Sequence, residues 1–95
     1  MKKQRVEISL LAQKDLHSFE RFANYSPDAT RFTDRMLQRV RSLEFFPQQG
    51  ICVEGKPDVY RLVFGRFKIF YQYCEGSDLV KILRFWRAER EEDPL

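Results

Sequence analysis

The sequence of 95 residues has little cysteine and little histidine. Its two cysteines, Cys52 and Cys74, form no Cys-x-x-Cys pair, and His17 is the single histidine. A disulfide framework needs a larger set of cysteines, and a structural zinc site needs four suitably spaced cysteine or histidine ligands. We therefore expect a protein with no metal or other cofactor, working in the reducing environment of a cytoplasm.

Long apolar runs are also missing. The basic residues 1–5 resemble the start of a signal peptide, but Glu7, Lys14 and Asp15 interrupt the apolar residues that follow. Hydrophobic residues make up 43% of the chain and charged residues 33%, which is typical of a soluble globular protein and not of a membrane or disordered one. The length predicts one domain, residues 1–95, with a core that is stable without cross-links.

Apolar residues recur at helical spacing in two segments. The first set is Ala12, Leu16, Phe19 and Ala23, and the second is Ala29, Phe32, Met36, Val40 and Leu43. Each set lies on one helical face. Ser9 is a suitable N-cap for the first helix, after a short alternating strand at residues 6–8. Ser26, Pro27 and Asp28 are typical of the start of the second helix, which Pro47 and Gly50 follow. The sequence predicts a helical hairpin.

The second half of the chain has the composition of strands. Residues 59–64 and 67–73 are rich in β-branched and aromatic side chains, and Gly65-Arg66 between them suits a two-residue type II′ turn. Pairing Phe64 with Phe67 gives a core face of Tyr60, Leu62, Phe64, Phe67, Ile69 and Tyr71. Residues 79–86 follow as a third antiparallel strand, whereas residues 48–57 are typical of a loop. The predicted fold class is α+β, with the helical hairpin covering one face of a mostly antiparallel sheet.

Basic residues are concentrated on these strands. Six of them lie from Arg61 to Arg87 against two acidic residues, and acidic residues return from Glu89 to Asp93. If Tyr73 pairs with Leu79, then Lys68 lies opposite Arg84 and Phe70 opposite Ile82. Arg61, Lys68 and Arg84 would then cluster on the open face of the sheet beside Trp86, with few acidic residues close by. A solvated face is the simpler interpretation of the charge alone.

A second basic stripe lies on the predicted second helix. Arg31, Arg35 and Arg39 repeat at four-residue spacing, which places like charges next to one another. Either Asp28 and Asp34 offset this stripe locally, or a partner compensates it.

Four short motifs follow one another along nearly the whole chain. They are Ala12, Asp15 and Leu16 in the first helix; Leu43, Pro47 and Gly50 after the second; Tyr60-Arg61, Gly65 and residues 68–71 in the hairpin; and Ile82, Leu83, Arg84 and Trp86 in the last strand. In this order and spacing they resemble the RelE/ParE toxin superfamily of bacterial type II toxin-antitoxin modules.

The resemblance implies one of two activities. RelE-like members are ribosome-dependent endoribonucleases that cleave messenger RNA, with arginines or lysines holding the phosphate and a histidine or tyrosine transferring protons. ParE-like members inhibit DNA gyrase. Both branches imply a cognate antitoxin that is partly disordered and folds on the toxin, giving a hetero-oligomer. The resemblance also implies a role in plasmid stabilisation.

The residues favour the ParE-like branch. Many RelE-like members read Trp-His-x-x-Arg where this chain has residues 86–90, Trp-Arg-Ala-Glu-Arg. Arginine is a poor general base because it stays protonated, and His17 is expected on a helix surface. No tyrosine follows Trp86, and Glu89 is a weak substitute in a solvated turn.

The sequence therefore predicts a growth-inhibiting toxin with no assigned catalytic residue. The target-binding residues expected from the resemblance and the charge pattern are Arg61, Lys68, Arg84, Trp86, Arg87 and Arg90. The alternative is a nuclease that uses Lys68, Arg61, Arg84 and Arg87 with an unidentified base, and a third possibility is a toxin fold that is not toxic.

Overall fold

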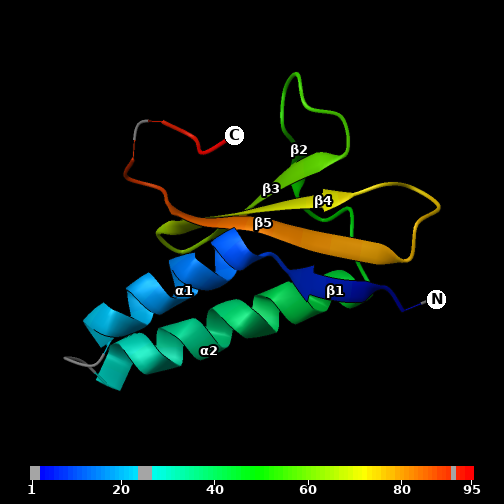
Figure 1. Ribbon diagram of the computed structural model, residues 1–95. Helices are drawn as coiled ribbons and strands as arrows, with labels where there is room; N and C mark the ends of the chain where they lie inside the picture. Colours follow the sequence, from blue (N-terminus) through cyan, green and yellow to red (C-terminus); the bar gives the residue numbers. More distant parts are fainter. Residues whose placement is uncertain (1–2, 24–26, 91) are drawn as a thin grey trace.

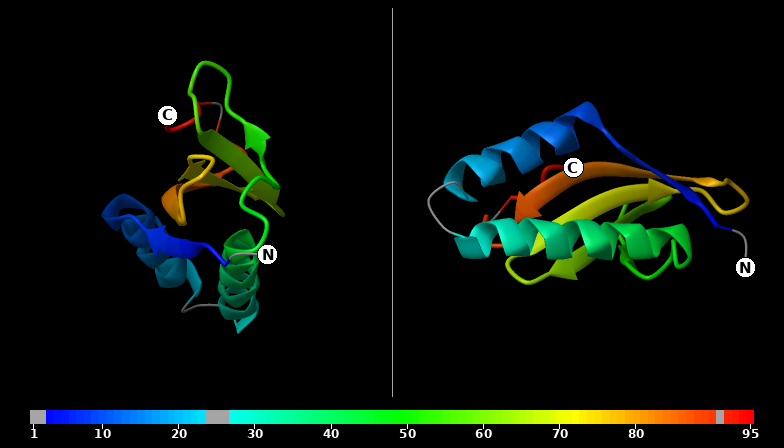
Figure 2. Two further views of the ribbon diagram at one scale, coloured as in Figure 1. Left: turned by 90° about the vertical axis from the view of Figure 1, so that its right-hand side faces the viewer. Right: turned by 90° about the horizontal axis from the view of Figure 1, so that it is seen from below.

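The computed structural model describes residues 3–23, 27–90 and 92–95 of the chain and has two layers (Figure 1). The elements are β1 (Arg5–Ile8), α1 (Leu10–Ala23), α2 (Pro27–Arg41), the 3-10 helix η1 (Ser42–Glu44), β2 (Ile51–Cys52), β3 (Val59–Phe64), β4 (Phe67–Tyr73) and β5 (Leu79–Arg87). Helices α1 and α2 lie side by side against one face of the sheet (Figure 2). This confirms the predicted α+β architecture. No helix within the described ranges has the length and apolar character needed to cross a membrane.

The start of each helix follows local chemistry. The Ser9 hydroxyl accepts a hydrogen bond from the Ala12 N–H (3.1 Å), as an N-cap does. The same hydroxyl donates to the Leu83 carbonyl (3.0 Å), so the cap also ties α1 to β5. Pro27 is the first residue of α2, as predicted. The expected cap at Ser26 lies outside the described residues.

The sheet has five strands in the order β1-β5-β4-β3-β2. β1 pairs in parallel with β5, and the other neighbours are antiparallel. A parallel pair needs a crossover connection, and the helical hairpin begins that crossover directly after β1. β2 lies in the segment predicted as loop, because a two-residue edge strand has no alternating pattern to reveal it.

The register of the sheet agrees with the prediction in one hairpin and differs in the other. Phe64 pairs with Phe67, and Gly65 in the turn has a positive φ of 57°. Between β4 and β5, however, Tyr73 pairs with Val80 and Phe70 with Arg84. The predicted pairings of Tyr73 with Leu79, Lys68 with Arg84 and Phe70 with Ile82 are therefore wrong.

A β-bulge causes the difference. Tyr71 pairs with Ile82 while Phe70 pairs with Arg84, so Leu83 is an extra residue in β5. Lys68 consequently lies opposite Trp86. The bulge lets both Ile82 and Phe85 enter the core, although an unbroken strand would point them to opposite faces.

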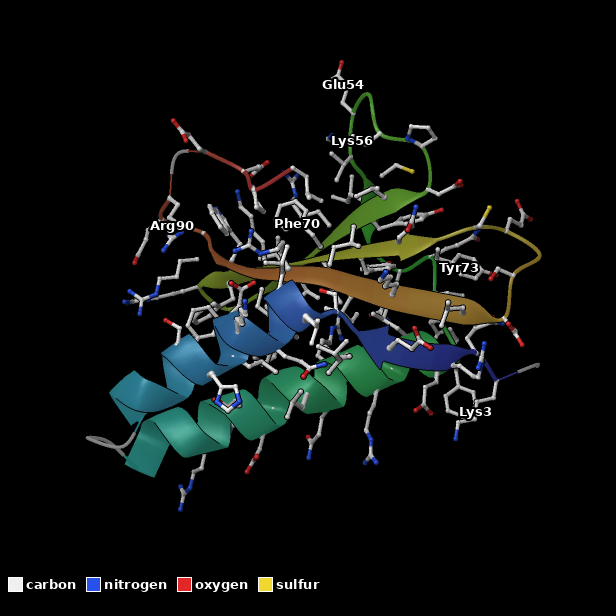
Figure 3. All side chains as sticks on the ribbon, viewed as in Figure 1. Lys3, Glu54, Lys56, Phe70, Tyr73 and Arg90 are labelled. Carbon is white, nitrogen blue, oxygen red and sulfur yellow. The ribbon has the colours of Figure 1, made fainter. Side chains whose placement is uncertain are left out.

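The core lies between the helices and the sheet. The predicted core face is confirmed: Leu62, Ile69 and Tyr71 are buried, and Tyr60, Phe64 and Phe67 pack against them. One buried aromatic ring lies elsewhere. Phe70 has no exposed surface, yet it points to the side of the sheet away from the helices (Figure 3). Something other than a helix must cover it.

Candidate target-binding face

The sheet face away from the helices carries the predicted basic residues. Arg61 on β3 lies across from Phe70 on β4, and Lys68 on β4 lies across from Trp86 on β5. We call Arg61, Lys68, Arg84 and Trp86 the basic face. The structure brings these four residues together as predicted, but it also brings carboxylates to them.

Asp93 joins two of the cations. Its carboxylate lies 2.9 Å from Lys68 Nζ and 4.0 Å from Arg61 Nη1. The Lys68 side chain is only 19% exposed, so this pair is shielded from water more than a typical surface salt bridge. The expectation that few acidic residues lie near the cluster is wrong, because the chain after β5 returns over the sheet.

The charge of Arg84 is balanced by a carboxylate of α1. Its Nε and Nη2 donate to the two oxygens of Asp15 on α1, at 2.8 and 2.9 Å, and the Phe85 N–H donates to the same carboxylate at 3.0 Å. The hydrogen bonds with Asp15 raise the pKa of the Arg84 guanidinium above its ordinary value, while partial burial opposes this. Arg84 is thus a structural link between a helix and the sheet as well as a member of the basic face.

Trp86 is held by three groups. The Arg84 guanidinium lies 5.1 Å from its ring centre and the Arg90 guanidinium 4.4 Å, both within range for cation–π attraction. The indole N–H donates to the Glu92 carbonyl at 2.7 Å. The predicted grouping of Arg90 with Trp86 therefore exists in the structure.

Arg87 lies apart from this cluster. It pairs with Phe67, its guanidinium is 5.9 Å from the ring of Phe19 on α1, and it contacts Glu89 at 3.5 Å. Because neighbouring strand residues point to opposite faces, Arg87 is on the helix side of the sheet and Trp86 on the other. The prediction that Arg87 joins Lys68 and Arg84 at one site is not supported by this geometry.

The proposed proton-transfer residues are also distant or exposed. His17 is exposed on α1, as expected, and α1 lies on the far side of the sheet from Lys68. The Glu89 side chain is 63% exposed and contacts the Arg87 guanidinium. Cys52 and Cys74 are exposed free thiols, and the described residues hold no cluster of three acidic, histidine or cysteine side chains suited to a metal ion.

The roles of Asp15 and Asp93 are not among the sequence predictions. Asp15 nevertheless lies at helical spacing from Ala12 and Phe19 and therefore next to the buried stripe. An acidic residue at such a position indicates a buried partner. No comparable signal identifies Asp93, because it lies in a run of acidic residues that looks solvated.

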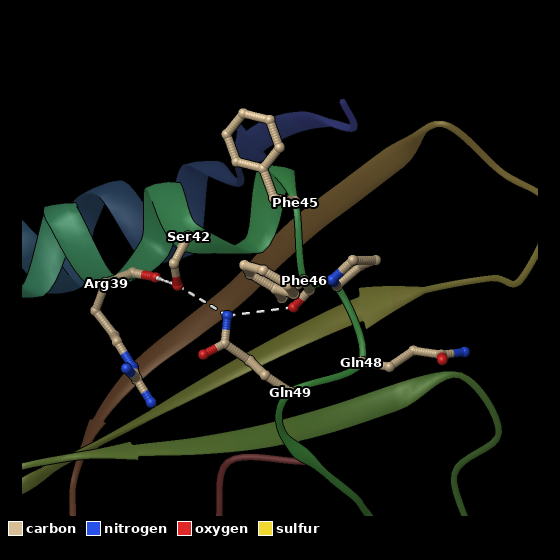
Figure 4. Close-up of a pocket in the computed structure, with 7 residues that line it drawn as sticks. Arg39, Ser42, Phe45, Phe46, Gln48 and Gln49 are labelled. Carbon is tan, nitrogen blue, oxygen red and sulfur yellow. Dashed lines mark hydrogen bonds between the residues drawn. The ribbon is translucent and has the colours of Figure 1, made fainter. Parts of the chain in front are cut away.

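A separate surface lies around the end of α2. Seven residues line a hollow of about 620 Å³ (Figure 4): Arg39, Ser42, Phe45, Phe46, Pro47, Gln48 and Gln49. The Gln49 amide donates to the Ser42 hydroxyl (2.8 Å) and to the Phe46 carbonyl (3.2 Å), which fixes one wall. The rings of Phe45 and Phe46 are 47% and 56% exposed.

The arginine stripe of α2 reaches this hollow. Arg31, Arg35 and Arg39 are exposed, and none forms a salt bridge with any residue in the described ranges. Asp34 therefore does not pair with the stripe, and the Asp28 side chain lies outside the described part. This surface combines exposed positive charge with exposed aromatic rings.

Comparisons with known proteins agree on the fold. Residues 6–92 match the family model described as the ParE toxin of the type II toxin-antitoxin system parDE. No curated protein sequence matched the chain significantly.

Solved structures of low sequence identity share the architecture. A chromosomal ParDE system from P. aeruginosa has a TM-score of 0.76 at 18% identity, covering 94% of this chain and 100% of that one. The RelBE2 toxin-antitoxin complex from Mycobacterium tuberculosis gives 0.71 at 18%, with coverage of 90% and 98%. The archaeal RelE-RelB complex from Pyrococcus horikoshii OT3 gives 0.68 at 27%, with coverage of 95% and 99%. With the family model matching almost the whole chain, this protein belongs to the ParE toxin family of type II toxin-antitoxin systems.

Proposed function

We propose that this protein inhibits bacterial growth by binding a macromolecular target, and that the target is DNA gyrase. The observation that carries the proposal is the separation of Arg87 from Lys68. Residue 87 occupies the position of the histidine in many RelE-like nucleases, and here it is an arginine on the opposite face of the sheet. The basic face can bind negative charge, but within the described residues it has no histidine to transfer protons.

The test measures gyrase and message in parallel. Purified protein is added to a DNA supercoiling reaction and to a purified translation system. We expect supercoiling to fall and ribosome-bound message to stay intact. Cleavage of message at codon positions, with supercoiling unaffected, would establish the nuclease alternative and reject the gyrase proposal.

A matched pair of lysine variants locates the active surface. Lys68→Gln removes a cation from the basic face, whereas Lys81→Gln removes an exposed cation that pairs with Gln72 nearer the other end of the same sheet. We expect Lys68→Gln to weaken inhibition and Lys81→Gln to leave it unchanged. Equal inhibition by both variants would place the target contact elsewhere.

We further propose that a cognate antitoxin docks on α2 and the adjoining hollow. Arg31, Arg35 and Arg39, which form no salt bridge within the described residues, favour an acidic segment, and the exposed rings of Phe45 and Phe46 favour apolar side chains in the same segment. Disordered segments that fold on a partner can cover such an extended surface.

Co-expression with the product of the neighbouring reading frame tests this docking site. Restored growth identifies that product as the antitoxin, and hydrogen exchange in the complex should then slow in α2. Arg35→Glu should weaken the complex, while the control Lys81→Glu, which makes the same charge change on the sheet, should not. Unchanged exchange in α2 within a confirmed complex would reject the location.

A further inference from the structure

The chain after β5 folds back over the basic face. Residues 88–90 and 92–95, which we call the covering segment, lie on the side of the sheet opposite the helices (Figure 1). The Ala88 N–H donates to the Arg66 carbonyl at 2.7 Å, at the end of the β3–β4 hairpin. Further along, the Glu92 carbonyl accepts the Trp86 indole N–H. The segment is therefore fastened to the sheet at both of these points.

Asp93 occupies the centre of the basic face. One of its oxygens lies against Lys68 of β4 and the other faces Arg61 of β3. On β4, two residues from Lys68 and across from Arg61, Phe70 is fully buried, although no helix of the described ranges covers this side of the sheet. The contact with Asp93 of the covering segment accounts for the low exposure of Lys68.

The chemistry of this contact matches that of a phosphate group. A carboxylate that takes one oxygen to a lysine and the other to an arginine makes charge-assisted contacts of the kind a phosphodiester makes with the same side chains. The Arg61 Nε is a buried donor with no hydrogen-bond partner among the described residues. A nucleic-acid backbone carries successive phosphodiesters, and together these offer more acceptor oxygens than the two of Asp93, so that one is available to this nitrogen.

The segment is also attached weakly enough to be displaced. Asp93 is 35% exposed and Arg61 37%, and an ion pair of 4.0 Å between side chains exposed to this degree contributes little to stability. The shorter pair with Lys68, which is 19% exposed, is the stronger of the two and the main contact that a competing anion has to replace. Among the described residues of the segment, the charged side chains that contact the rest of the chain are Asp93 with Lys68 and Arg61, Glu89 with Arg87, and Arg90 with Trp86. A polyanion that offers several phosphates would compete favourably with one carboxylate.

We propose that the covering segment is a displaceable cover, in which Asp93 takes the place of a phosphate until a nucleic-acid backbone binds Lys68 and Arg61. The inference rests on the proposed function in one respect, that the basic face is the surface that contacts the target. It adds the chemistry of the contact, a phosphodiester, and a form of self-inhibition.

Trp86 provides a direct probe of the cover. It is the single tryptophan of the chain, and its indole contacts both Glu92 and Arg90 of the covering segment. Its fluorescence should therefore change when the segment leaves the sheet. A short single-stranded RNA and a short DNA duplex are titrated separately into the full chain, so that the two sources of phosphodiester are distinguished.

The decisive comparison is between two variants that each remove one acidic charge. Asp93→Asn should bind the preferred nucleic acid about 3- to 10-fold more tightly than the unmodified protein. The control Asp78→Asn removes a carboxylate that faces Arg5 at 3.9 Å, away from the basic face. It should change affinity by less than about twofold, because only long-range charge is altered. Lys68→Gln in the Asp93→Asn background should abolish the gain, and circular dichroism verifies that each variant is folded.

Several results would overturn the proposal that the covering segment is displaced by nucleic acid. Equal affinities for the Asp93→Asn and Asp78→Asn variants would do so, as would nucleic-acid binding that leaves Trp86 emission and hydrogen exchange of residues 92–95 unchanged. Absence of nucleic-acid binding, with an acidic peptide producing the Trp86 signal instead, would assign the face to a protein partner. If gyrase is not inhibited but Asp93→Asn still binds more tightly, the gyrase proposal fails and the cover stands.

Discussion

The Asp15 carboxylate connects α1 to β5 through three hydrogen bonds, two from the Arg84 guanidinium and one from the Phe85 N–H. The Asp15 and Arg84 side chains are only 15% and 23% exposed. Asp15→Asn preserves the shape of the side chain but removes its charge and turns an NH2 group toward donors. Asparagine can still accept from one of the three donors, so the variant loses part of the network and leaves Arg84 without its counter-charge.

The expected loss of stability follows from the hydrogen bonds that Asp15→Asn removes. Hydrogen bonds to charged groups contribute about 1.5–3 kcal/mol each. With one acceptor retained and some access to water, we expect the free energy of unfolding to fall by about 2–3 kcal/mol. For a chain of this size that lowers the thermal midpoint by roughly 8–24 °C.

Urea unfolding followed by circular dichroism measures the change. The midpoint should fall by roughly 2 M if the slope is about 1–1.5 kcal/mol per molar urea. Asp34→Asn is the matched control, because Asp34 is exposed on α2 and forms no salt bridge with the described residues. It should alter stability by less than about 0.5 kcal/mol.

A double-mutant cycle checks the assignment to Arg84. Combining Asp15→Asn with Arg84→Gln should reveal a coupling of about 1–3 kcal/mol, as expected for residues in one network. Stability of Asp15→Asn within about 0.5 kcal/mol of the unmodified protein would refute the reasoning. It would show that the connection between α1 and β5 depends on apolar packing alone.

Two further predictions concern the buried hydroxyl of Tyr71. In Gly50→Ala the new Cβ would lie 2.8 Å from Tyr71 Oη and 2.9 Å from the Arg61 carbonyl oxygen, so unfolding experiments should show a loss of about 1–3 kcal/mol from overpacking. Adding Tyr71→Phe to Gly50→Ala should relieve part of that loss. If Gly50→Ala alone causes no loss, the segment between η1 and β2 can shift to make room for the new methyl group. Burial raises the pKa of Tyr71 to about 12 from 10.0, despite the hydrogen bond from the Gly50 N–H. The unfolded phenol therefore ionises first as pH rises, and stability should fall by about 2–3 kcal/mol between pH 10 and 12. The free energy of unfolding is measured at several pH values for the unmodified protein and for Tyr71→Phe. The difference between the two proteins should change between pH 10 and 12, and a difference that does not vary with pH would contradict the prediction.

The sequence predicted which residues of the basic face lie together but not what surrounds them. It groups Arg61, Lys68, Arg84 and Trp86, and the strand register brings these four side by side. It treated Arg84 as an exposed charge, however, whereas Asp15 binds it. It also added Arg87, which the alternation of β5 places against Phe19 on the helix side. Simple removal of Arg84 charge is therefore expected to destabilise the fold as well as alter the face.

The features that the sequence determined by itself are local. The apolar stripe of α2, the Ser9 cap of α1 and the Gly65 turn each depend on residues within a few positions of one another, and such periodicity and turn chemistry act before any tertiary contact forms. The Phe64–Phe67 pairing follows from the turn, and it fixes which face of the hairpin enters the core.

The features that only the tertiary structure decided join residues far apart in the chain. The bulge at Leu83 shifts the β4–β5 register, because the core accommodates both Ile82 and Phe85. Arg84 meets Asp15 across 69 positions, and Lys68 meets Asp93 across 25. Charge attraction depends on distance in space and on exposure to water, and neither can be obtained from sequence spacing. For that reason the same acidic residues that look solvated in the sequence cover the basic face in the folded protein.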